Sequence, residues 1–409
     1  MSDMYELYVG IDWASTSHQI CLLRPDGAQE TFAVAHSGAG LATLRARLQG
    51  RVARPERIAV AIEVPRGAVV EALLAQGCHV YAINPKQLDR FRDRHTVAGA
   101  KDDRRDAFVA ADALRTDRAA FRRVQPEDPR VLQLRELSRL HGELVEEQGR
   151  LANRLREQLW RFYPQLLAVS PAADEEWLWE VLTLAPTPTQ GRRLTVSALR
   201  ALLARHRIRR LPADAVYAAL QEPALPVGAG TIAAASEHLG VLVPRLRLVH
   251  EQRAQCERRL DRLLRELAAP AGADPVEHRD VTILQSLPGA GRVVVATMLA
   301  EAGPALADRD YQTLRAHAGI APVTRQSGKS RLVLMRHSCN RRLRTAMFHW
   351  ARNAIRLDAV SRAHYDRLRQ CHDHARALRG VADRLLSLAI TLLRNGQLYD
   401  RGRRQRVAA

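Results

Sequence analysis

Three aspartates gather within five positions of the segment AGAKDDRRDAFVAADAL, residues 98–114, in a chain whose formal net charge is +19. A helix that starts here places Asp103 and Asp106 on one face, because they are three residues apart. Asp102 and Asp106 are four residues apart, so the pattern alone leaves open which of the first two joins Asp106. Carboxylates grouped in this way hold hard cations such as Mg²⁺. The alternative is a solvated helix start that does no chemistry.

Two further carboxylates end apolar runs earlier in the chain. LYVGID ends on Asp12, and RIAVAIEV ends near Glu63. An aspartate after a strand is commonly a turn or capping residue, so each position alone says little. Together with the cluster at Asp102 to Asp106, however, they offer carboxylates from three elements. Phosphodiester chemistry uses such a set, because two Mg²⁺ ions about 4 Å apart clamp the attacking and leaving oxygens.

The elements that must position these carboxylates fill the first ~120 residues, where strand and helix patterns alternate. The residues predict three strands in hairpin succession, then helix, strand, helix, strand and a final helix. This order is that of the RNase H superfamily, an α/β layer architecture. In such a sheet the first and fourth strands are neighbours. We therefore expect Asp12 and Glu63 to project from one edge.

Two long helices follow. Leucines from Leu134 to Leu159 recur at spacings of three, four or seven, and a second series runs from Leu246 to Leu267. Both series suit either an antiparallel helical hairpin or a coiled-coil seam between protomers, and periodicity does not separate the two. Between them, residues 184–193 and 222–230 are typical of loops, and a short helix is expected at 196–206.

A third region, mostly helical, runs from about residue 275 to about residue 395. Residues 284–303 have the form of a helix-hairpin-helix, whose turn at Gly289 and Gly291 can direct backbone N–H groups at a phosphate. An ordinary turn between helices is the alternative. Residues 319–330 predict a polar loop. A serine in such a loop, here Ser327, is usually a turn residue.

The composition points to a polyanionic partner. The sequence pI is about 10.8, and 60 of the 63 basic residues are arginine, which binds phosphate in a bidentate manner. Five scattered cysteines favour free thiols in a reducing cytoplasm, and no apolar run is long enough to cross a membrane. We therefore expect a cytoplasmic, nucleoid-associated protein without a membrane partner. The candidate phosphate contacts are Lys101, Lys329, Arg341, Arg342 and Arg344. A solvated helix face is the alternative for the three arginines.

The whole chain resembles the DEDD-type transposases of bacterial insertion sequences, the insertion sequence 110 family, which are recombinases guided by a bridge RNA. The N-terminal half carries this resemblance through GIDWA, IEVPRG, INPKQLDRFR and AGAKDDRRDA. The C-terminal half carries it through LPGAG followed by AEAG, LRAHAGIAPVTRQSGKS, CNRRLR and NGQLYD.

The resemblance implies a RuvC-like catalytic domain whose metal-binding tetrad falls on Asp12, Glu63, Asp103 and Asp106, with Mg²⁺ as the cofactor. It places the family's nucleophilic serine on Ser327, with Ser330 as the second choice. It also implies a homo-oligomer, a dimer or tetramer, in which domains of different protomers complete one site on double-stranded DNA and guide RNA.

These inferences give four expected parts. They are a RuvC-like domain at 1–125, a helical coiled-coil region for dimerisation at 126–274, a C-terminal transposase domain at 275–396 and a basic tail at 397–409.

The expected function is metal-assisted cutting and rejoining of insertion-sequence DNA through a phosphoserine. The alternative is a RuvC-like junction endonuclease without serine chemistry. A sugar kinase or actin-like ATPase also opens with GID, but WASTSH lacks the glycine-rich phosphate turn that such proteins need. A non-catalytic nucleic-acid-binding protein ranks last.

Overall fold

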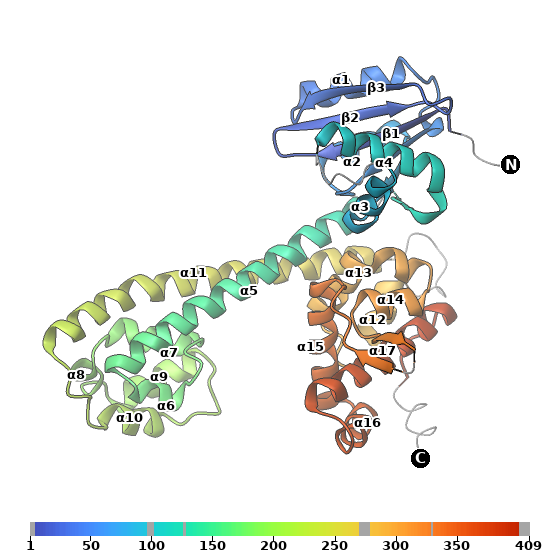
Figure 1. Cartoon of the computed structure of the whole chain (residues 1–409). Helices are drawn as coiled ribbons and strands as arrows, with labels where there is room; N and C mark the ends of the chain where they lie inside the picture. Colours follow the sequence, from blue (N-terminus) through green and yellow to red (C-terminus); the bar gives the residue numbers. More distant parts are fainter. Residues whose placement is uncertain (1–4, 96–101, 126–127, 270–278, 329, 401–409) are drawn as a thin grey trace. The chain divides into compact units, whose positions relative to one another are not determined.

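The computed structural model describes residues 5–95, 102–125, 128–269, 279–328 and 330–400. These residues form two compact units, Met1–Glu127 and Asp128–Ala409 (Figure 1). The first is a mixed α/β unit, and the second is mostly helical. No helix in the described ranges is both long and apolar enough to cross a membrane.

The first unit contains one six-stranded sheet in the order β3-β2-β1-β4-β5-β6. Strands β1, β4 and β5 are parallel, whereas β2, β3 and β6 run antiparallel to their neighbours. This matches the predicted succession of strands and helices, and it is consistent with an RNase H-like fold. The short edge strand β6 was not predicted. The strands span Leu7–Trp13 (β1), Ser17–Leu23 (β2), Gln29–Ala35 (β3), Ile58–Ile62 (β4), His79–Ala82 (β5) and Arg122–Arg123 (β6).

Helices cover both faces of this sheet (Figure 1). Alternate residues of β1 point to opposite faces, so Leu7, Val9 and Ile11 pack with α1 and α2. Ala59 and Ala61 of β4 pack with α3 and α4 on the other face. The helices and helical turns are α1 (Gly38–Gln49), η1 (Pro55–Arg57), α2 (Ala68–Gln76), α3 (Pro85–Asp93), α4 (Asp103–Asp117) and η2 (Arg118–Ala120).

Two long helices, α5 (Pro129–Phe162) and α11 (Ala229–Ala268), pack against each other within the chain (Figure 1). Arg130 near the start of α5 donates to the Glu266 carbonyl near the end of α11, at 3.4 Å. Cys256 donates to the Leu137 carbonyl at 3.3 Å. These contacts make the pair antiparallel, which confirms the helical hairpin. A seam between protomers stays a prediction.

Five short helices connect α5 to α11: α6 (Gln165–Val169), α7 (Glu176–Leu184), α8 (Pro188–Gly191), α9 (Val196–Arg205) and α10 (Ala213–Gln221). The helix expected at 196–206 is therefore present. The expected loop at 184–193 contains the single turn of α8, which a capping box at Thr187 and Gln190 stabilises. Helix α11 starts at Ala229 and continues through Pro244, so it is longer at its N-terminal end than its leucine series predicted.

The rest of the second unit contains α12 (Asp280–Ser286), α13 (Arg292–Ala307), α14 (Tyr311–His317), α15 (Arg341–Leu357), α16 (Ala359–Arg369) and α17 (His374–Asn395). One hydrophobic core runs through this unit from Leu134 to Leu393. Between α14 and α15, the strands β7 (Val323–Ser327) and β8 (Ser330–Leu334) form an antiparallel hairpin. The prediction of a loop at 319–330 was therefore wrong for residues 323–327 and for Ser330. Strand β7 has the sequence VTRQS, which is mostly polar and exposed, so it carries no apolar alternation.

Candidate active site

Asp12 and Glu63 lie at the same edge of the sheet. The parallel register pairs Ile11 of β1 with Ile62 of β4, so one further step along both chains brings Asp12 opposite Glu63. Asp12 is the second-last residue of β1, and Glu63 directly follows β4. Both residues are half-buried. The structure thus places these two carboxylates as the sequence predicted.

Helix α4 lies directly on β1 beside Asp12. A Cβ added at Gly10 would stand 1.8 Å from the Ala107 carbonyl oxygen and 2.7 Å from the Ala111 nitrogen, so only glycine allows this approach. Gly10 and Asp12 are two residues apart on one strand and therefore share the face that α4 covers. The packing on Gly10 thus sets how closely α4 approaches β1 beside Asp12.

The direction of α4 brings its first turn to the Asp12 end of β1. At the other end of the helix, the Arg118 guanidinium lies 5.2 Å from the ring centre of Tyr5, which precedes β1. Helix α4 therefore runs antiparallel to β1 and begins near the edge that carries Asp12 and Glu63. Three elements, β1, β4 and α4, contribute carboxylates to one end of the sheet.

The cluster at the start of α4 divides into three roles. Asp102 is the N-cap, and its carboxylate accepts a hydrogen bond from the Arg104 backbone N–H at 3.3 Å. Asp103 opens the helix and is exposed, whereas Asp106 is only 3% exposed. The helix thus begins where the pattern predicted, and the alternative of a solvated helix start describes Asp102.

Arg92 is a partner of this cluster that the sequence reasoning missed. Its Nε lies 2.8 Å from an Asp106 carboxylate oxygen, and its terminal nitrogen lies 3.1 Å from Asp89. A buried carboxylate needs such a partner, because burial of an unpaired charge is costly. Arg92 stands in INPKQLDRFR, and its distance of fourteen residues from Asp106 gives no periodic signal.

A second ion-pair group joins the same two segments. His95 Nε2 lies 3.1 Å from one oxygen of Asp112, and Arg115 lies 2.6 Å from the other oxygen. Asp112 is 8% exposed. These contacts, together with that of Arg92, fix α4 against α3 and the residues that follow it.

The four carboxylates fit a metal site in their chemistry and in the edge they share. Their oxygens are the hard ligands that Mg²⁺ prefers. Within the described residues, however, no three acidic, histidine or cysteine side chains stand close enough together to hold a metal ion. Asp106 is instead held by Arg92. Lys101, the predicted cation beside this cluster, lies outside the described residues.

Ser327 ends β7 at the tip of the exposed hairpin in the second unit. It pairs with Ser330 across the strands, and Gly328 at the turn has a φ of +53°, which glycine adopts without strain. Paired residues of an antiparallel ladder face the same side, so both hydroxyls lie on the face that carries Arg325 and Leu332. Lys329 lies outside the described residues.

The basic helix α15 follows this hairpin in the chain. Its arginines differ in the contacts they make. Arg342 donates to the Arg139 carbonyl at 3.2 Å and lies 3.7 Å from Glu143 of α5. Arg344 bonds the Cys339 sulfur at 3.1 Å. Arg341 is exposed, and the described part of the chain offers its guanidinium no ion pair.

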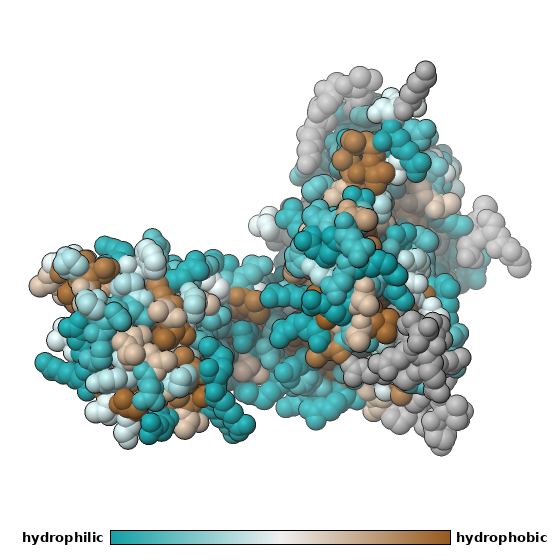
Figure 2. All heavy atoms as spheres, turned by 90° about the horizontal axis from the view of Figure 1, so that it is seen from below, coloured by the Kyte–Doolittle hydropathy of each residue, from teal (hydrophilic) through white to brown (hydrophobic). Residues whose placement is uncertain are grey.

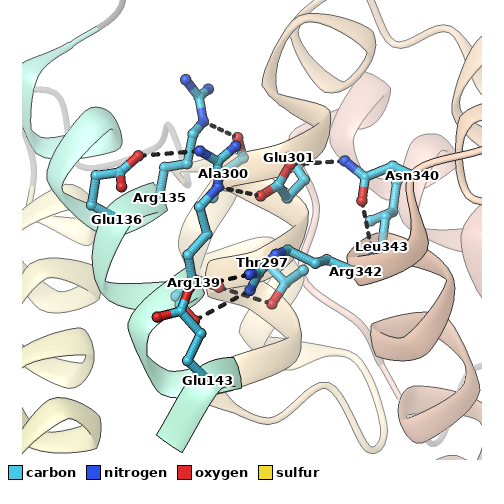
Figure 3. Close-up of polar contacts among 11 residues, drawn as sticks. Arg135, Glu136, Arg139, Glu143, Thr297, Ala300, Glu301, Asn340, Arg342 and Leu343 are labelled. Atoms are coloured by element: carbon cyan, nitrogen blue, oxygen red, sulfur yellow. Dashed lines mark hydrogen bonds and ion pairs between the residues drawn. The ribbon is translucent and has the colours of Figure 1, made fainter. Parts of the chain in front are cut away.

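Glu301 of α13, whose side chain is 8% exposed, joins α5 to the start of α15 (Figure 3). Arg139 lies 3.1 Å from one of its oxygens, and the Asn340 amide donates to the other at 2.8 Å. The Asn340 side-chain oxygen in turn accepts from the Leu343 N–H and caps α15. Burial disfavours the Glu301 charge, but the bonds from Arg139 and Asn340 outweigh it and hold its pKa below the ordinary value.

The predicted helix-hairpin-helix turn packs against α15. Gly289 has a φ of +76°, and a Cβ there would stand 2.5 Å from the Ala354 nitrogen. Trp350 of α15 donates to the Pro288 carbonyl at 3.0 Å, and the Gly291 N–H donates to the Gly289 carbonyl. Gly291 itself is exposed at the start of α13. The close packing on α15 thus explains why residue 289 is a glycine. Phosphate binding at this turn stays a prediction.

The two units differ sharply in charge. Residues 1–127 contain 18 basic and 16 acidic residues, a net charge of +2. Residues 128–409 contain 45 basic and 28 acidic residues, a net charge of +17. Hydrophilic side chains cover much of the face drawn in Figure 2, with apolar patches between them. The positive potential that attracts a polyanion therefore comes almost entirely from the second unit.

Comparisons with known proteins give family matches in both the N-terminal and the C-terminal half of the chain. A family model described as a transposase, of the DEDD type, matches residues 9–164, and the model of the transposase IS116/IS110/IS902 family matches residues 281–366. The mini-circle putative transposase for IS117 of Streptomyces coelicolor is 33% identical over 98% of this chain and 97% of its own length.

Two further relatives match a smaller share of this chain. The putative transposase y4uE of Sinorhizobium fredii is 49% identical over 52% of this chain, and the match spans 60% of that relative. A 43.6 kDa uncharacterized protein of insertion element IS110 in Streptomyces coelicolor is 32% identical over 79% of this chain and 78% of its own length. The chain belongs to the IS110/IS116 family of DEDD transposases.

Proposed function

We propose that this transposase cuts and rejoins the DNA strands of an insertion sequence through a covalent phosphoserine, with Mg²⁺ as cofactor and a bridge RNA as guide. The observation that supports the cutting activity is that Asp12, Glu63 and the first turn of α4 all lie toward one edge of the sheet. Carboxylates from three elements at one edge suit phosphodiester chemistry.

The acidic residues would hold the metal. Asp12, Glu63, Asp103 and Asp106 supply the ligands, and Asp106 would exchange or share its contact with Arg92. Mg²⁺ when bound supplies Lewis acidity that stabilises the charge developing on the phosphate. Asp103 is the exposed member of the pair on α4, so a cation can reach its carboxylate from solvent.

Ser327 is the proposed nucleophile. Its oxygen bonds to the phosphorus while the bond from phosphorus to one deoxyribose oxygen breaks. The serine proton leaves to solvent, and the departing oxygen takes up a proton as a free hydroxyl. A hydroxyl from a second strand then displaces the serine, so phosphodiester bonds are conserved without ATP. The exposed hairpin tip supports this role because DNA can reach the hydroxyl there.

The second unit would hold the nucleic acids. Its net charge of +17 and the arginines at the start of α15 suit backbone contacts to DNA and to a structured RNA. Target choice would then lie in base pairing of the guide RNA, as in other RNA-guided systems. Exposed apolar side chains on the α5–α11 hairpin, Leu140, Val145, Val241 and Leu248, support the proposed homo-oligomer.

A trapping experiment tests this function. The purified protein is incubated with Mg²⁺, the flanking non-coding RNA and labelled element-junction DNA, then denatured and examined for label that migrates with protein. We expect an adduct that Ser327→Ala and Asp103→Asn both abolish, whereas Asp102→Asn retains it. Ser330→Ala is the matched control for the serine and also retains the adduct.

Two other outcomes would decide against the proposal. Cleaved DNA without an adduct, unaffected by Ser327→Ala, would indicate a RuvC-like junction nuclease. An adduct that survives Ser327→Ala but not Ser330→Ala would move the nucleophile across the hairpin. Omission of the RNA tests the guide separately, since site-specific cleavage should then fall to background.

A further inference from the structure

Trp13 directly follows Asp12 at the end of β1 and is 41% exposed. Tryptophan at the edge of a sheet is usually covered, because its large ring gains free energy from burial. Consecutive strand residues point to opposite faces, so the indole and the Asp12 carboxylate flank the same strand end from two sides. No step of the proposed reaction uses this side chain.

Two histidines hold the exposed indole in place. The His18 ring stacks on Trp13, with ring centres 6.2 Å apart and an interplanar angle of 29°. The His36 ring meets Trp13 edge-on at 6.4 Å. His18 Nε2 and His36 Nδ1 are hydrogen-bonded at 2.9 Å, which ties the two rings together. The indole is thus a supported aromatic plane rather than a loose surface side chain.

The histidine pair that holds Trp13 lowers the stability of the folded state. His18 is completely buried, and within the described residues its Nδ1 has no hydrogen-bond partner. Burial of a polar atom without a partner destabilises a fold. An aliphatic residue at this position would fill the core without that loss. The histidine pair is therefore better explained by what it holds than by the stability it adds.

The surroundings of Trp13 suit a nucleic acid. Ser15 and Thr16 follow it in an exposed turn, and Arg66 is exposed in the segment after β4, the strand that neighbours β1. Hydroxyls and a guanidinium are the groups that position a sugar–phosphate backbone. An aromatic plane among such groups is the arrangement on which bases of a single strand stack.

We propose that Trp13 stacks on a nucleobase next to the scissile phosphate and so positions that phosphate at Asp12. The proposal rests on the proposed DNA cleavage at this edge of the sheet. The base belongs to the strand being cut, since one strand passing the end of β1 meets Asp12 with its phosphate and Trp13 with an adjacent base. Trp13 is a positioning residue, and it contributes no group to bond making or breaking.

The test measures cleavage of the element's own end DNA by the full-length chain, with single abasic sites walked through the nucleotides that flank the cut. We expect Trp13→Ala to lower kcat/KM on intact DNA roughly tenfold, the scale of one lost base-stacking contact. Trp13→Phe should retain most activity. At one abasic position wild type and Trp13→Ala should cleave equally, because the contact is already absent there.

Trp160 provides the matched control, because it is 69% exposed but lies in the second unit. Trp160→Ala should match wild type on every substrate. A second readout is 2-aminopurine placed at the sensitive position, whose fluorescence should be quenched by wild type and not by Trp13→Ala. This binding signal does not depend on catalysis.

The outcomes separate the two proposals. A loss in Trp13→Ala that is the same at every abasic position, without a change in quenching, would mean that the indole only supports the fold, and would overturn the inference. Wild-type activity of Trp13→Ala on intact DNA would overturn it as well. Undiminished cleavage by Asp12→Asn would instead overturn the proposed function at this edge.

Discussion

The contact between Arg92 and Asp106 bears directly on how the proposed metal site would work. Asp106 is almost fully buried, and Arg92 at 2.8 Å compensates its charge. A metal ion that binds Asp106 would take over that compensation. In the proposed metal site the arginine would keep the Asp106 charge compensated while no cation is bound, and would compete with the cation once it arrives.

Arg92→Ala tests both halves of this argument. Removal of one partner of a buried ion pair should lower the free energy of unfolding by about 3 kcal/mol. Mg²⁺ should restore part of that loss, because binding to the folded state alone stabilises it. Thermal melts of wild type and variant with and without Mg²⁺ provide the measurement. Arg92→Ala with Asp106→Asn is the control, and a Mg²⁺ response that persists there would show that Asp106 is not a ligand.

The roles of residues that stand in local sequence patterns could be predicted. Contacts between residues that are brought together only by folding could not. The strand ends at Asp12 and Glu63 were predictable, because apolar runs mark both strands and the succession of strands and helices makes the two strands neighbours. The capping role of Asp102 follows from its place before a helix. Arg92 gave no signal, because its contact with Asp106 exists only once α3 and α4 have packed.

Among the elements, α4 is positioned by the absence of a side chain at Gly10. A methyl group there would collide with the backbone of Ala107, which cannot move without shifting the whole helix. Its first turn holds Asp103 and Asp106, so a shift of α4 moves both away from Asp12. Stability and activity should therefore fall together at this position.

Gly10→Ala should lower the free energy of unfolding by about 3 kcal/mol, the upper range for overpacking. It should also reduce cleavage more than Mg²⁺-independent DNA binding, because the acids move and the arginines of the second unit do not. Chemical denaturation and cleavage assays check this. Gly38→Ala is the control, since nothing stands within 4 Å of a Cβ at that position. Equal stability of the two variants would contradict the close approach of α4.

Glu301 positions the start of α15, as Gly10 positions α4. Its pKa lies below the ordinary value of about 4.5, so its carboxylate stabilises the folded state above that pH. The contribution is lost as the pH falls through the folded-state pKa. Glu301→Gln should lower the free energy of unfolding by about 2 kcal/mol at pH 7. It should also flatten the acid limb of a stability–pH curve.

Glu136→Gln is the matched control for that curve. Glu136 also contacts Arg139, at 3.2 Å, but its side chain is 74% exposed. Its loss should leave the acid limb unchanged, because solvent screens exposed pairs. If Glu301→Gln left the acid limb as steep as in wild type, the network in Figure 3 would not hold the start of α15.

The elements that sequence reasoning missed share a physical cause. Strand β7 is mostly polar, and β8 carries Leu332, Val333 and Leu334 in succession, so neither strand shows the alternation of apolar and polar residues that marks a half-buried strand. The early start of α11 was missed because its first turns carry small residues and a proline follows at Pro244. The two long helices were predicted, because their leucines repeat over many turns. Their pairing within the chain was one of two alternatives that the repeat left open, and α5 and α11 bury these leucines in one core.

At the scale of the whole molecule, the charge is unevenly divided between two units. The unit with the acidic edge carries +2, and the unit with Ser327 carries +17. The unit proposed to cut DNA is nearly neutral, so it adds little to the attraction of a polyanion. A strongly positive second unit concentrates the polyanion instead. Nucleic-acid affinity should therefore depend on the second unit and on salt.

Binding of non-specific duplex DNA should weaken steeply as salt rises, because each neutralised phosphate releases counterions. Arg341→Gln should reduce the slope of log affinity against log salt concentration by about 1, the value for one phosphate contact. Arg342→Gln should change it less, because Arg342 already contacts Glu143 and the Arg139 carbonyl. Fluorescence anisotropy over a salt series measures both slopes. If both variants kept the wild-type slope, the start of α15 would not contact the backbone, and the grip would lie elsewhere in the basic unit.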